Sequence, residues 1–244
     1  MNILAKMAMA TALAAVLGTA AASAQTVRMG TEGAYPPFNF VNDNGEVDGF
    51  EREVGDELCA RANLDCVWVT NEWDSIIPNL TSGNYDTIIA GMSITDERDQ
   101  VIDFTQEYFP PDPSRYMALA GAELSDGAVV AAQTATIQAG YLAGTGYTLV
   151  EFATPDETVA AVTSGEADAV LADESYLAGI IDASNGELAF VGDPVSIGGG
   201  VGIGVRESDG ELKDKLNAAI DSMKADGTLA ALIAKWFDGR VVSY

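Results

Sequence analysis

The chain has 244 residues, and its 37 Asp and Glu residues outnumber its 12 Lys and Arg residues, which gives a formal net charge of −25 without any histidine. A surface of this charge repels nucleic acid and anionic membranes, so neither is expected as a partner. In other respects the composition is that of an ordinary globular protein.

The first 24 residues have the features of a secretory signal peptide. Lys6 supplies a positive start, residues 8–22 are rich in Ala, Leu and Val, and Ala22-Ser23-Ala24 forms a small-x-small cleavage site. The apolar run is too short to span a bilayer, and no later segment is apolar for long enough. A buried N-terminal helix is the alternative. We expect an exported, soluble protein that starts near Gln25, with no membrane insertion.

The two cysteines are predicted to form a disulfide in the exported protein. Cys59 and Cys66 are seven residues apart, and a continuous helix would hold their Cα atoms about 10 Å apart, beyond the roughly 4.4–6.8 Å that a disulfide spans. The helix must therefore end between them, and Asn63 is a suitable left-handed cap before a strand at 66–69. A redox or metal-binding pair is the alternative, although the spacing does not suit it and partner ligands are lacking.

Short strands and helices alternate along the chain, which predicts an α/β fold with mainly parallel sheets. Strands are predicted at 27–30, 67–69, 87–90, 116–119, 129–132, 169–171 and 201–205. Helices are predicted at 50–62, 73–82, 136–143, 156–163, 174–183, 211–225 and 228–237.

One segment has a counterpart later in the chain. LTSGNYDTIIAGMS (80–93) and VTSGEADAVLADES (162–175) share a helix end, a Ser-Gly cap, an Asp, a short strand and then polar residues. Such features are also common in α/β proteins in general. If the likeness reflects two lobes built alike, residues 91–98 and Asp173 face each other across a cleft at the carboxyl ends of strands.

Two linkers bracket a segment without basic residues. Residues 116–205 contain twelve acidic residues and no Lys or Arg; YFPPDPSRY precedes this segment and IGGGVGIGV ends it. Proline favours extended backbone and glycine permits large φ changes, as expected of two strands that cross between lobes. We expect a first lobe at 25–110, a second lobe at 111–203 and a return to the first lobe at 204–244.

The stretch AGMSITDER (90–98) has the chemistry of a site for a zwitterion. Ala90 and Gly91 leave the backbone open, so that their carbonyls and the Ser93 hydroxyl can accept from an ammonium. The guanidinium of Arg98 matches a carboxylate in two places, and Asp173 would neutralise the ammonium. The alternative for Arg98 is a surface ion pair with a neighbouring aspartate.

These motifs together resemble the periplasmic solute-binding proteins of polar amino-acid ABC transporters, the bacterial extracellular solute-binding protein family 3. The resemblance covers the mature chain and includes GTEGAYPPFNF, VDGFEREVGDEL, EWDSIIPNLTSGNYDTIIAGMSITDERDQVIDFT, AAQTATIQAGYL, SGEADAVLADESY and DGTLAALIAKWF. The chain is most similar to lysine/arginine/ornithine and histidine binders, which have a similar cysteine pair. The family has a type II two-lobed fold, in which two crossover strands join lobes made of mainly parallel sheets flanked by helices.

The resemblance also implies roles for single residues. Arg98 resembles the carboxylate clamp, and Thr136 the threonine that meets the carboxylate at a helix N-terminus. Tyr35 and Trp73 resemble an aromatic pair around the ligand side chain, although both could instead pack the lobe. Glu32 lies where binders of basic amino acids have an acid. The remaining contacts carried over are Ala90, Gly91, Ser93 and Asp173, and the family usually has glycine or serine at Ala135.

We therefore expect a periplasmic monomer that binds an amino acid and delivers it to the membrane permease of an ABC importer. Arginine, lysine or ornithine is the first expectation, and a neutral polar amino acid or an opine is the alternative. No cofactor, metal or catalytic residue is expected, because the chain lacks histidine and its charged groups suit the holding of a zwitterion. A dehydratase-like enzyme on the same fold is the remaining alternative.

Overall fold

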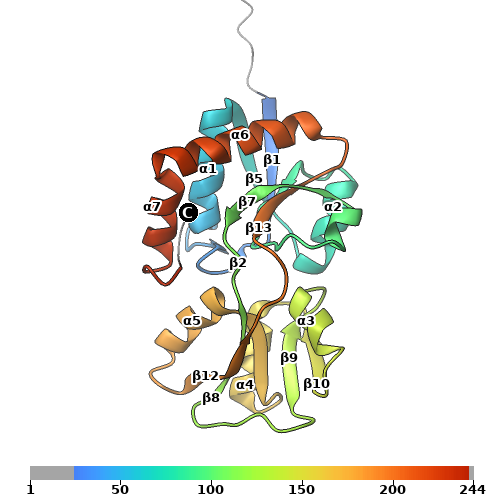
Figure 1. Ribbon diagram of the computed structural model, residues 1–244, viewed down its shortest axis with the longest axis vertical. Helices are drawn as coiled ribbons and strands as arrows, with labels where there is room; N and C mark the ends of the chain where they lie inside the picture. The colour runs from blue at the N-terminus through green and yellow to red at the C-terminus, as the bar shows by residue number, and fades with distance from the viewer. Residues whose placement is uncertain (1–24, 242–244) are drawn as a thin grey trace, which may run out of the picture.

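The computed structural model describes residues 25–241, so the expected signal peptide lies outside the described residues. Two five-stranded sheets form two lobes, each flanked by helices (Figure 1). The strand order is β5-β1-β6-β13-β7 in the first lobe and β10-β9-β11-β8-β12 in the second. A small sheet of β2, β3 and β4 belongs to the first lobe, and β2 lies on the side of that lobe that faces the second.

The elements up to the first crossover are β1 Gln25–Thr31, β2 Ala34–Tyr35, β3 Asn39–Val41, β4 Val47–Asp48, α1 Phe50–Ala62, β5 Leu64–Thr70, the 3₁₀ turn Trp73–Ser75, α2 Ile76–Thr81, β6 Thr87–Ile88, the 3₁₀ turn Arg98–Gln100 and β7 Asp103–Phe109. The second lobe contains β8 Ser114–Leu119, β9 Val129–Gln133, α3 Ile137–Leu142, β10 Thr148–Phe152, α4 Pro155–Ser164, β11 Ala169–Asp173, α5 Glu174–Ala183 and β12 Leu188–Val195. The chain then adds β13 Val201–Val205, α6 Gly210–Asp226 and α7 Thr228–Trp236.

The two sheets have the same pairing pattern. β1 is parallel to β5 and β6, just as β9 is parallel to β10 and β11. β13 is antiparallel to β6 and β7, and β8 is antiparallel to β11 and β12. Half of the pairings are thus antiparallel, and the prediction of mainly parallel sheets was wrong in this respect. The reason is that the two crossover strands of each lobe pair with their neighbours in the opposite direction.

The lobes are joined by residues 110–113, between β7 and β8, and by residues 196–200, between β12 and β13 (Figure 1). Val201–Val205 pairs entirely within the first sheet, although the sequence-based boundary assigned 201–203 to the second lobe. Glycine suits the second link, since a Cβ at Gly200 would lie 2.8 Å from the Glu107 Cβ and Gly198 has a left-handed φ of 74°. We propose 25–109, 114–195 and 201–241 as the lobe segments, with the two links between them.

The expected elements mostly correspond to observed ones. α1 and α5 have the predicted bounds, and most of the other helices differ by one or two residues at an end. β6 is shorter than predicted because the chain turns away at Gly91, which has a φ of 60°. Three strands of the two large sheets were missed: β7, β10 and β12 lie at sheet edges and do not alternate cleanly between buried and exposed residues. The short strands β2, β3 and β4 of the small sheet were missed as well.

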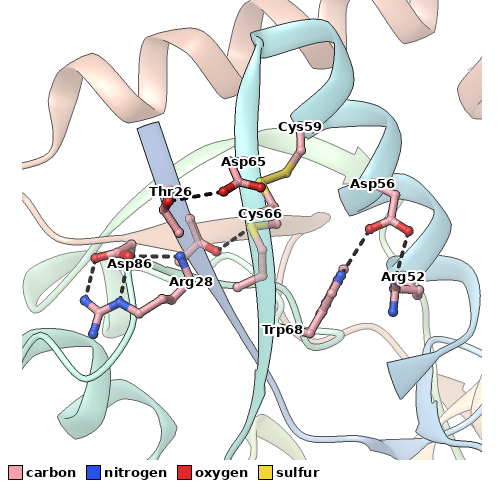
Figure 2. The surroundings of a disulfide bond; sticks show 11 residues. Thr26, Arg28, Arg52, Asp56, Cys59, Asp65, Cys66, Trp68 and Asp86 are labelled. Carbon is pink, nitrogen blue, oxygen red and sulfur yellow. Dashed lines mark hydrogen bonds and ion pairs between the residues drawn. A yellow bond between two sulfur atoms is a disulfide. The ribbon is translucent and has the colours of Figure 1, made fainter. Parts of the chain in front are cut away.

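The disulfide was predicted correctly. Cys59 on α1 and Cys66 on β5 are bonded, with their Cα atoms 6.2 Å apart (Figure 2). α1 ends at Asn63, whose φ of 53° and ψ of 47° are left-handed, as expected. Beside the bridge, Trp68 Nε1 donates to the Asp56 carboxylate at 3.1 Å. The bridge therefore ties α1 to the edge strand of the first sheet.

A group of buried aromatic rings lies in the core of the first lobe. The rings of Phe38, Phe109 and Phe237 have centroids 4.7–5.0 Å apart, and Phe50 packs against all three. Since Phe109 is the last residue before the first link, this core anchors the root of that link. Among residues 25–241, no helix is long and apolar enough to cross a bilayer.

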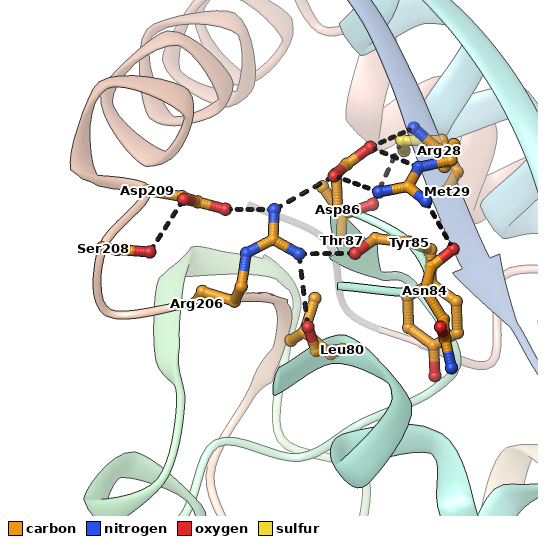
Figure 3. A network of polar contacts seen from close by, with 10 residues as sticks. All are labelled: Arg28, Met29, Leu80, Asn84, Tyr85, Asp86, Thr87, Arg206, Ser208 and Asp209. Atoms are coloured by element: carbon orange, nitrogen blue, oxygen red, sulfur yellow. Dashed lines mark hydrogen bonds and ion pairs between the residues drawn. The ribbon is translucent and has the colours of Figure 1, made fainter. Parts of the chain in front are cut away.

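The repeated sequence motif corresponds to a repeated hydrogen bond. The Asp86 carboxylate accepts from the backbone N–H of Arg28 at 2.9 Å, at the start of β6. The Asp168 carboxylate accepts from the N–H of Val129 at 2.8 Å, at the start of β11. In the first lobe alone, Arg206 also binds the Asp86 carboxylate at 3.0 Å (Figure 3). The two motifs therefore occupy equivalent places in the two lobes.

Candidate ligand-binding site

A polar cavity lies between the lobes. All of the site residues predicted from the sequence line it, together with Gln133, Ile137 and Gln138; the predicted ones are Glu32, Tyr35, Trp73, Ala90, Gly91, Ser93, Arg98, Thr136 and Asp173. Their function as ligand contacts stays a prediction. The structure thus brings together residues that are far apart in the sequence in one cavity.

The topology explains this convergence. The first lobe contributes the loops that follow β1 and β6, and also the two 3₁₀ turns. The second lobe contributes the end of β9, the start of α3 and the end of β11. Loops at the carboxyl ends of parallel strands meet at one edge of a sheet, and here both of these edges face the cleft.

Arg98 carries a charge that is poorly compensated. Its Nη1 donates to the backbone carbonyl of Ser93 at 2.9 Å, and its guanidinium lies 5.3 Å from the ring centroid of Trp73. It forms no ion pair within the part of the chain that the structure describes. Burial lowers the pKa of Arg98 to about 10, against the attraction of Asp173 and Glu97. The alternative of a surface ion pair with a neighbouring aspartate is therefore wrong.

Glu32 is joined to the second lobe by a hydrogen bond. Its Oε1 accepts from Gln133 Nε2 at 2.6 Å, and the same Nε2 donates to the carbonyl of Ala153 at 3.0 Å. Burial raises the pKa of Glu32 to about 7; the hydrogen bond from Gln133 opposes this rise, and nearby carboxylates add to it. A cation near Glu32 would stabilise the ionised carboxylate, as water does for an exposed glutamate.

Asp173 makes the second contact between the lobes. Its Oδ2 accepts from the Tyr35 hydroxyl at 3.0 Å, and its Oδ1 accepts from Gln138 Nε2 at 2.7 Å. Burial raises the pKa of Asp173. Burial also raises the pKa of Asp112 in the first link, and the negative charge of Asp173 raises the pKa of Asp112 further. The Tyr35 ring stacks on Tyr176 at 4.3 Å. Tyr35 thus bonds the carboxylate that is expected to meet an ammonium.

The start of α3 supplies the remaining wall. Thr136 caps this helix, accepting from the N–H of Ala139 at 3.2 Å and donating to the carbonyl of Gln133 at 2.6 Å. Ala135 has a φ of 60°, a left-handed value that glycine adopts without strain and other residues rarely do. Its carbonyl accepts from Trp73 Nε1 at 3.3 Å, across the cleft.

The sequence reasoning missed the two glutamines. Gln133 is the last residue of β9, so the rule that sites lie at strand ends could have identified it. Gln138 lies in the first turn of α3, two residues after Thr136, and a single sequence gives no sign that it reaches Asp173. No group of three or more His, Cys, Asp or Glu side chains within residues 25–241 is arranged to hold a metal ion.

The lobes are nearly closed on each other. The free space in the cavity is about 30 Å³, which is room for about two water molecules. Within residues 25–241, hydrogen bonds donated by the side chains of Tyr35, Trp73 and Gln133 and by the backbone N–H of Asp173 cross the cleft. A larger solute can therefore enter only when the lobes separate.

Two lobes of like topology, two links and a charged cavity between them define the class of two-lobed α/β binding proteins. The chain belongs to the bacterial extracellular solute-binding proteins, family 3, whose family model matches residues 27–239.

Individual relatives support this membership. The chain is 36% identical to the L-arginine-binding protein of Pseudomonas aeruginosa, over 88% of this chain and 89% of that protein. It is 33% identical to the lysine/arginine/ornithine-binding periplasmic protein of Escherichia coli K12, over 97% and 98% of the two chains. A solved periplasmic His/Glu/Gln/Arg/opine family-binding protein from Silicibacter pomeroyi, in complex with lysine, is 70% identical, with a TM-score of 0.87, over 89% of this chain and 100% of that one.

Proposed function

We propose that this protein binds an amino acid with a basic side chain, namely lysine, arginine or ornithine, between its two lobes. The observation that carries the proposal is Arg98, a cavity-lining guanidinium without an ion-pair partner among the described residues. A carboxylate is the group that its planar fork fits best, and pairing would repay the cost of burying the charge. The names of the three relatives above support the same class of ligand.

The rest of the cavity suits the other groups of such a ligand. Asp173 would meet the α-ammonium, aided by Ser93 and the carbonyls of Ala90 and Gly91. Tyr35 and Trp73 would flank the aliphatic part of the side chain.

Glu32 would then pair with the side-chain cation. Glu32 contacts Gln133 at the end of β9, whereas Arg98 contacts the Ser93 carbonyl and the Trp73 ring. The two charges thus lie against different walls of the cavity, as the two ends of a basic amino acid require. A neutral polar amino acid or an opine is the second candidate, because the Gln133 amide can hydrogen-bond a neutral side chain.

We propose in addition that the protein is a periplasmic monomer that hands its ligand to the permease of an ABC importer and catalyses no reaction. The relatives named above are binding proteins, two of them periplasmic by name. Incubation with a prephenate-like substrate tests the alternative of a dehydratase, since turnover would contradict a pure binding function. Light scattering of the purified protein tests the monomer.

The ligand assignment is tested by calorimetric titration of residues 25–244 with lysine, arginine, ornithine, glutamine and octopine. We expect the basic amino acids to bind most tightly. Arg98→Ala should weaken every amino acid by about 2–5 kcal/mol, because the ligand carboxylate loses its charged partner in a desolvated site. The control is Arg52→Ala, which removes a half-buried arginine of α1 that pairs with Asp56 and does not line the cavity, and which should leave binding unchanged. Tight binding to Arg98→Ala, or a parent protein that binds no amino acid, contradicts the proposal.

A further inference from the structure

A buried carboxylate lies directly behind the cavity. Glu51, in the first turn of α1, has no exposed surface and is not among the residues that line the cavity. It accepts three hydrogen bonds: from Asn39 Nδ2 at 2.7 Å, from the backbone N–H of Gly91 at 2.6 Å and from the Tyr108 hydroxyl. An isolated carboxylate is costly to bury, so its position behind this cavity calls for an explanation.

Each donor belongs to a segment that serves the cavity. Gly91 lines it directly and has a left-handed backbone that Glu51 fixes through the N–H. Asn39 in turn accepts through Oδ1 from the N–H of Gly33 at 2.7 Å, between the cavity residues Glu32 and Tyr35. One carboxylate therefore connects the two first-lobe loops that hold most of the cavity's first-lobe residues.

The third donor connects this network to the links between the lobes. Tyr108 is the next-to-last residue of β7, which leads directly into residues 110–113. It is also fully buried. The loops of the cavity and the root of the first link thus share one acceptor.

Only an acceptor without a hydrogen to donate satisfies this arrangement. The N–H of Gly91 can only donate, and Asn39 must present its NH₂ to Glu51 because its oxygen already accepts from Gly33. A glutamine side chain at this position would point its own NH₂ at one of these donors in either orientation. Burial raises the pKa of Glu51, the three hydrogen bonds oppose that rise, and the N-terminus of α1 favours the anion.

We propose that Glu51 and Asn39 are positioning residues that hold the two first-lobe loops in the geometry that binds ligand. This inference rests on the proposed function, because it assigns how the same site is kept in shape. Neither residue contacts the ligand in this account. They act on the loops through Gly33 and Gly91, and the charge of Glu51 also raises the pKa of Glu32.

The test exchanges the two side-chain types. Glu51→Gln leaves two donors facing each other, and Asn39→Asp places a second carboxylate against Glu51. The double variant reverses the direction of the hydrogen bond between the two positions. Its carboxylate at position 39 accepts from Gly33 and from the new amide, and the oxygen of that amide accepts from Gly91 and Tyr108.

The expected affinities follow from this exchange. Lysine affinity should fall about ten- to hundredfold in each single variant, because buried donors or charges are left without a partner. In the double variant it should return to within about threefold of the parent, since the two substitutions compensate each other.

Two controls separate positioning from stability. Glu53→Gln makes the same change on α1 at a residue that pairs with Lys235 on the surface. Leu216→Ala removes buried apolar volume on α6 and should lower stability without changing the lysine affinity of the folded protein. If the parent binds lysine, two results would overturn this inference but not the proposed function. One is an unchanged lysine affinity in Glu51→Gln, and the other is a double variant whose affinity does not recover. A parent that binds no amino acid overturns the proposed function as well.

A ligand-independent measurement covers variants that fold poorly or bind too weakly. Amide hydrogen exchange of the ligand-free protein should show slow exchange of the N–H groups of Gly33 and Gly91. The protection of both amides should depend on Glu51, directly at Gly91 and through Asn39 at Gly33. Exchange should be at least about tenfold faster at both in Glu51→Gln and slow again in the double variant. Rapid exchange of either amide in the parent overturns the proposal.

Discussion

Glu32 shows how burial determines what charge a cavity residue carries. Its pKa of about 7 means that much of it is protonated in the ligand-free protein at neutral pH. An acid with a raised pKa is neutral below that pKa and anionic above it, and a cationic side chain binds only to the anion. Binding of a basic amino acid should therefore lower this pKa and release a proton.

Lysine affinity should accordingly rise between about pH 6 and pH 8, by up to about tenfold per pH unit below the pKa, and then level off. Glutamine is the control ligand, because it shares the contacts to Arg98 and Asp173 but has no side-chain charge. The difference between the two ligands reports Glu32 alone. Calorimetry across this pH range measures it, and parallel profiles for lysine and glutamine would contradict the assignment.

Glu32→Gln should remove that difference. The variant keeps the shape of the side chain, so glutamine binding should change little, whereas lysine should weaken by about 1–3 kcal/mol. The same titrations at one pH decide this, with Glu72→Gln as a control at an acid near Glu32 that lies outside the cavity lining. Equal losses of affinity for lysine and glutamine would mean that Glu32 supports the site without contributing to selectivity for a cationic side chain.

At the scale of elements, the two Asp motifs offer a matched comparison. Asp86 binds Arg28 and Arg206, which hold its pKa well below the usual range, while Asp168 makes a backbone hydrogen bond where no arginine is near in sequence. Asp86→Asn should cost about 1–3 kcal/mol of unfolding free energy, and Asp168→Asn less. Urea denaturation of both variants measures this.

The pH dependence of stability gives the sign of the Asp86 contribution. Since its folded pKa lies below the unfolded value of 3.8, the stabilisation is present above about pH 4 and is lost as the pH falls further. The difference in stability between the parent and Asp86→Asn should therefore shrink toward pH 3. A difference that is constant between pH 7 and pH 3, or a larger cost at Asp168, would contradict this account.

The disulfide belongs to the same scale, because it connects a helix to a strand remote from the cavity residues. Replacing Cys59 and Cys66 together by alanine should lower the unfolding free energy by about 2–3 kcal/mol and leave lysine affinity unchanged. Urea denaturation of the double variant tests the expected loss of stability, and calorimetry tests the unchanged lysine affinity. Two reactive thiols in the unreduced, denatured parent, or a large loss of affinity in the variant, would argue against it.

Much of the fold could be predicted from the sequence because its signals are local. The bounds of α1 follow from its apolar spacing and the cap at Asn63, and the Ser-Gly motifs identified equivalent turns in both lobes. The strand directions could not be read in this way. β7, β10 and β12 owe their pairing to long-range contacts at the sheet edges, which leave no periodic pattern in those segments.

The candidate site divides along similar lines. Residues at strand ends, such as Arg98 and Asp173, were identified by their chemistry and the family resemblance. Contacts that depend on how closely the lobes approach could not be predicted from the sequence. Gln133, for example, meets Glu32 only because the end of a second-lobe strand lies against a first-lobe loop. Glu51 was missed for the opposite reason, since its acidic side chain looks like an exposed helix residue until its burial is known.

At the scale of the whole molecule, the cavity and the links predict a movement. The free space of about 30 Å³ is too small for an amino acid, and direct bonds from Tyr35 and Gln133 close the cleft. The lobes must separate to admit a ligand, and residues 110–113 and 196–200 are the segments where the backbone can change. Closure around an empty site leaves the buried Glu32 without a cationic partner, whereas a basic amino acid would pair with Arg98, Asp173 and Glu32.

Small-angle scattering should therefore show a more open ensemble without ligand and a smaller radius of gyration with saturating lysine, because the ligand favours the closed state by its differential affinity. Arg98→Ala is the matched control: at the same lysine concentration it should keep the larger radius, since the carboxylate contact that rewards closure is gone. Tyr35→Phe removes both hydrogen bonds between the Tyr35 hydroxyl and Asp173 and should enlarge the ligand-free radius further. Identical profiles for the parent with and without lysine, under conditions where calorimetry shows saturation, would mean that the lobes do not close on the ligand.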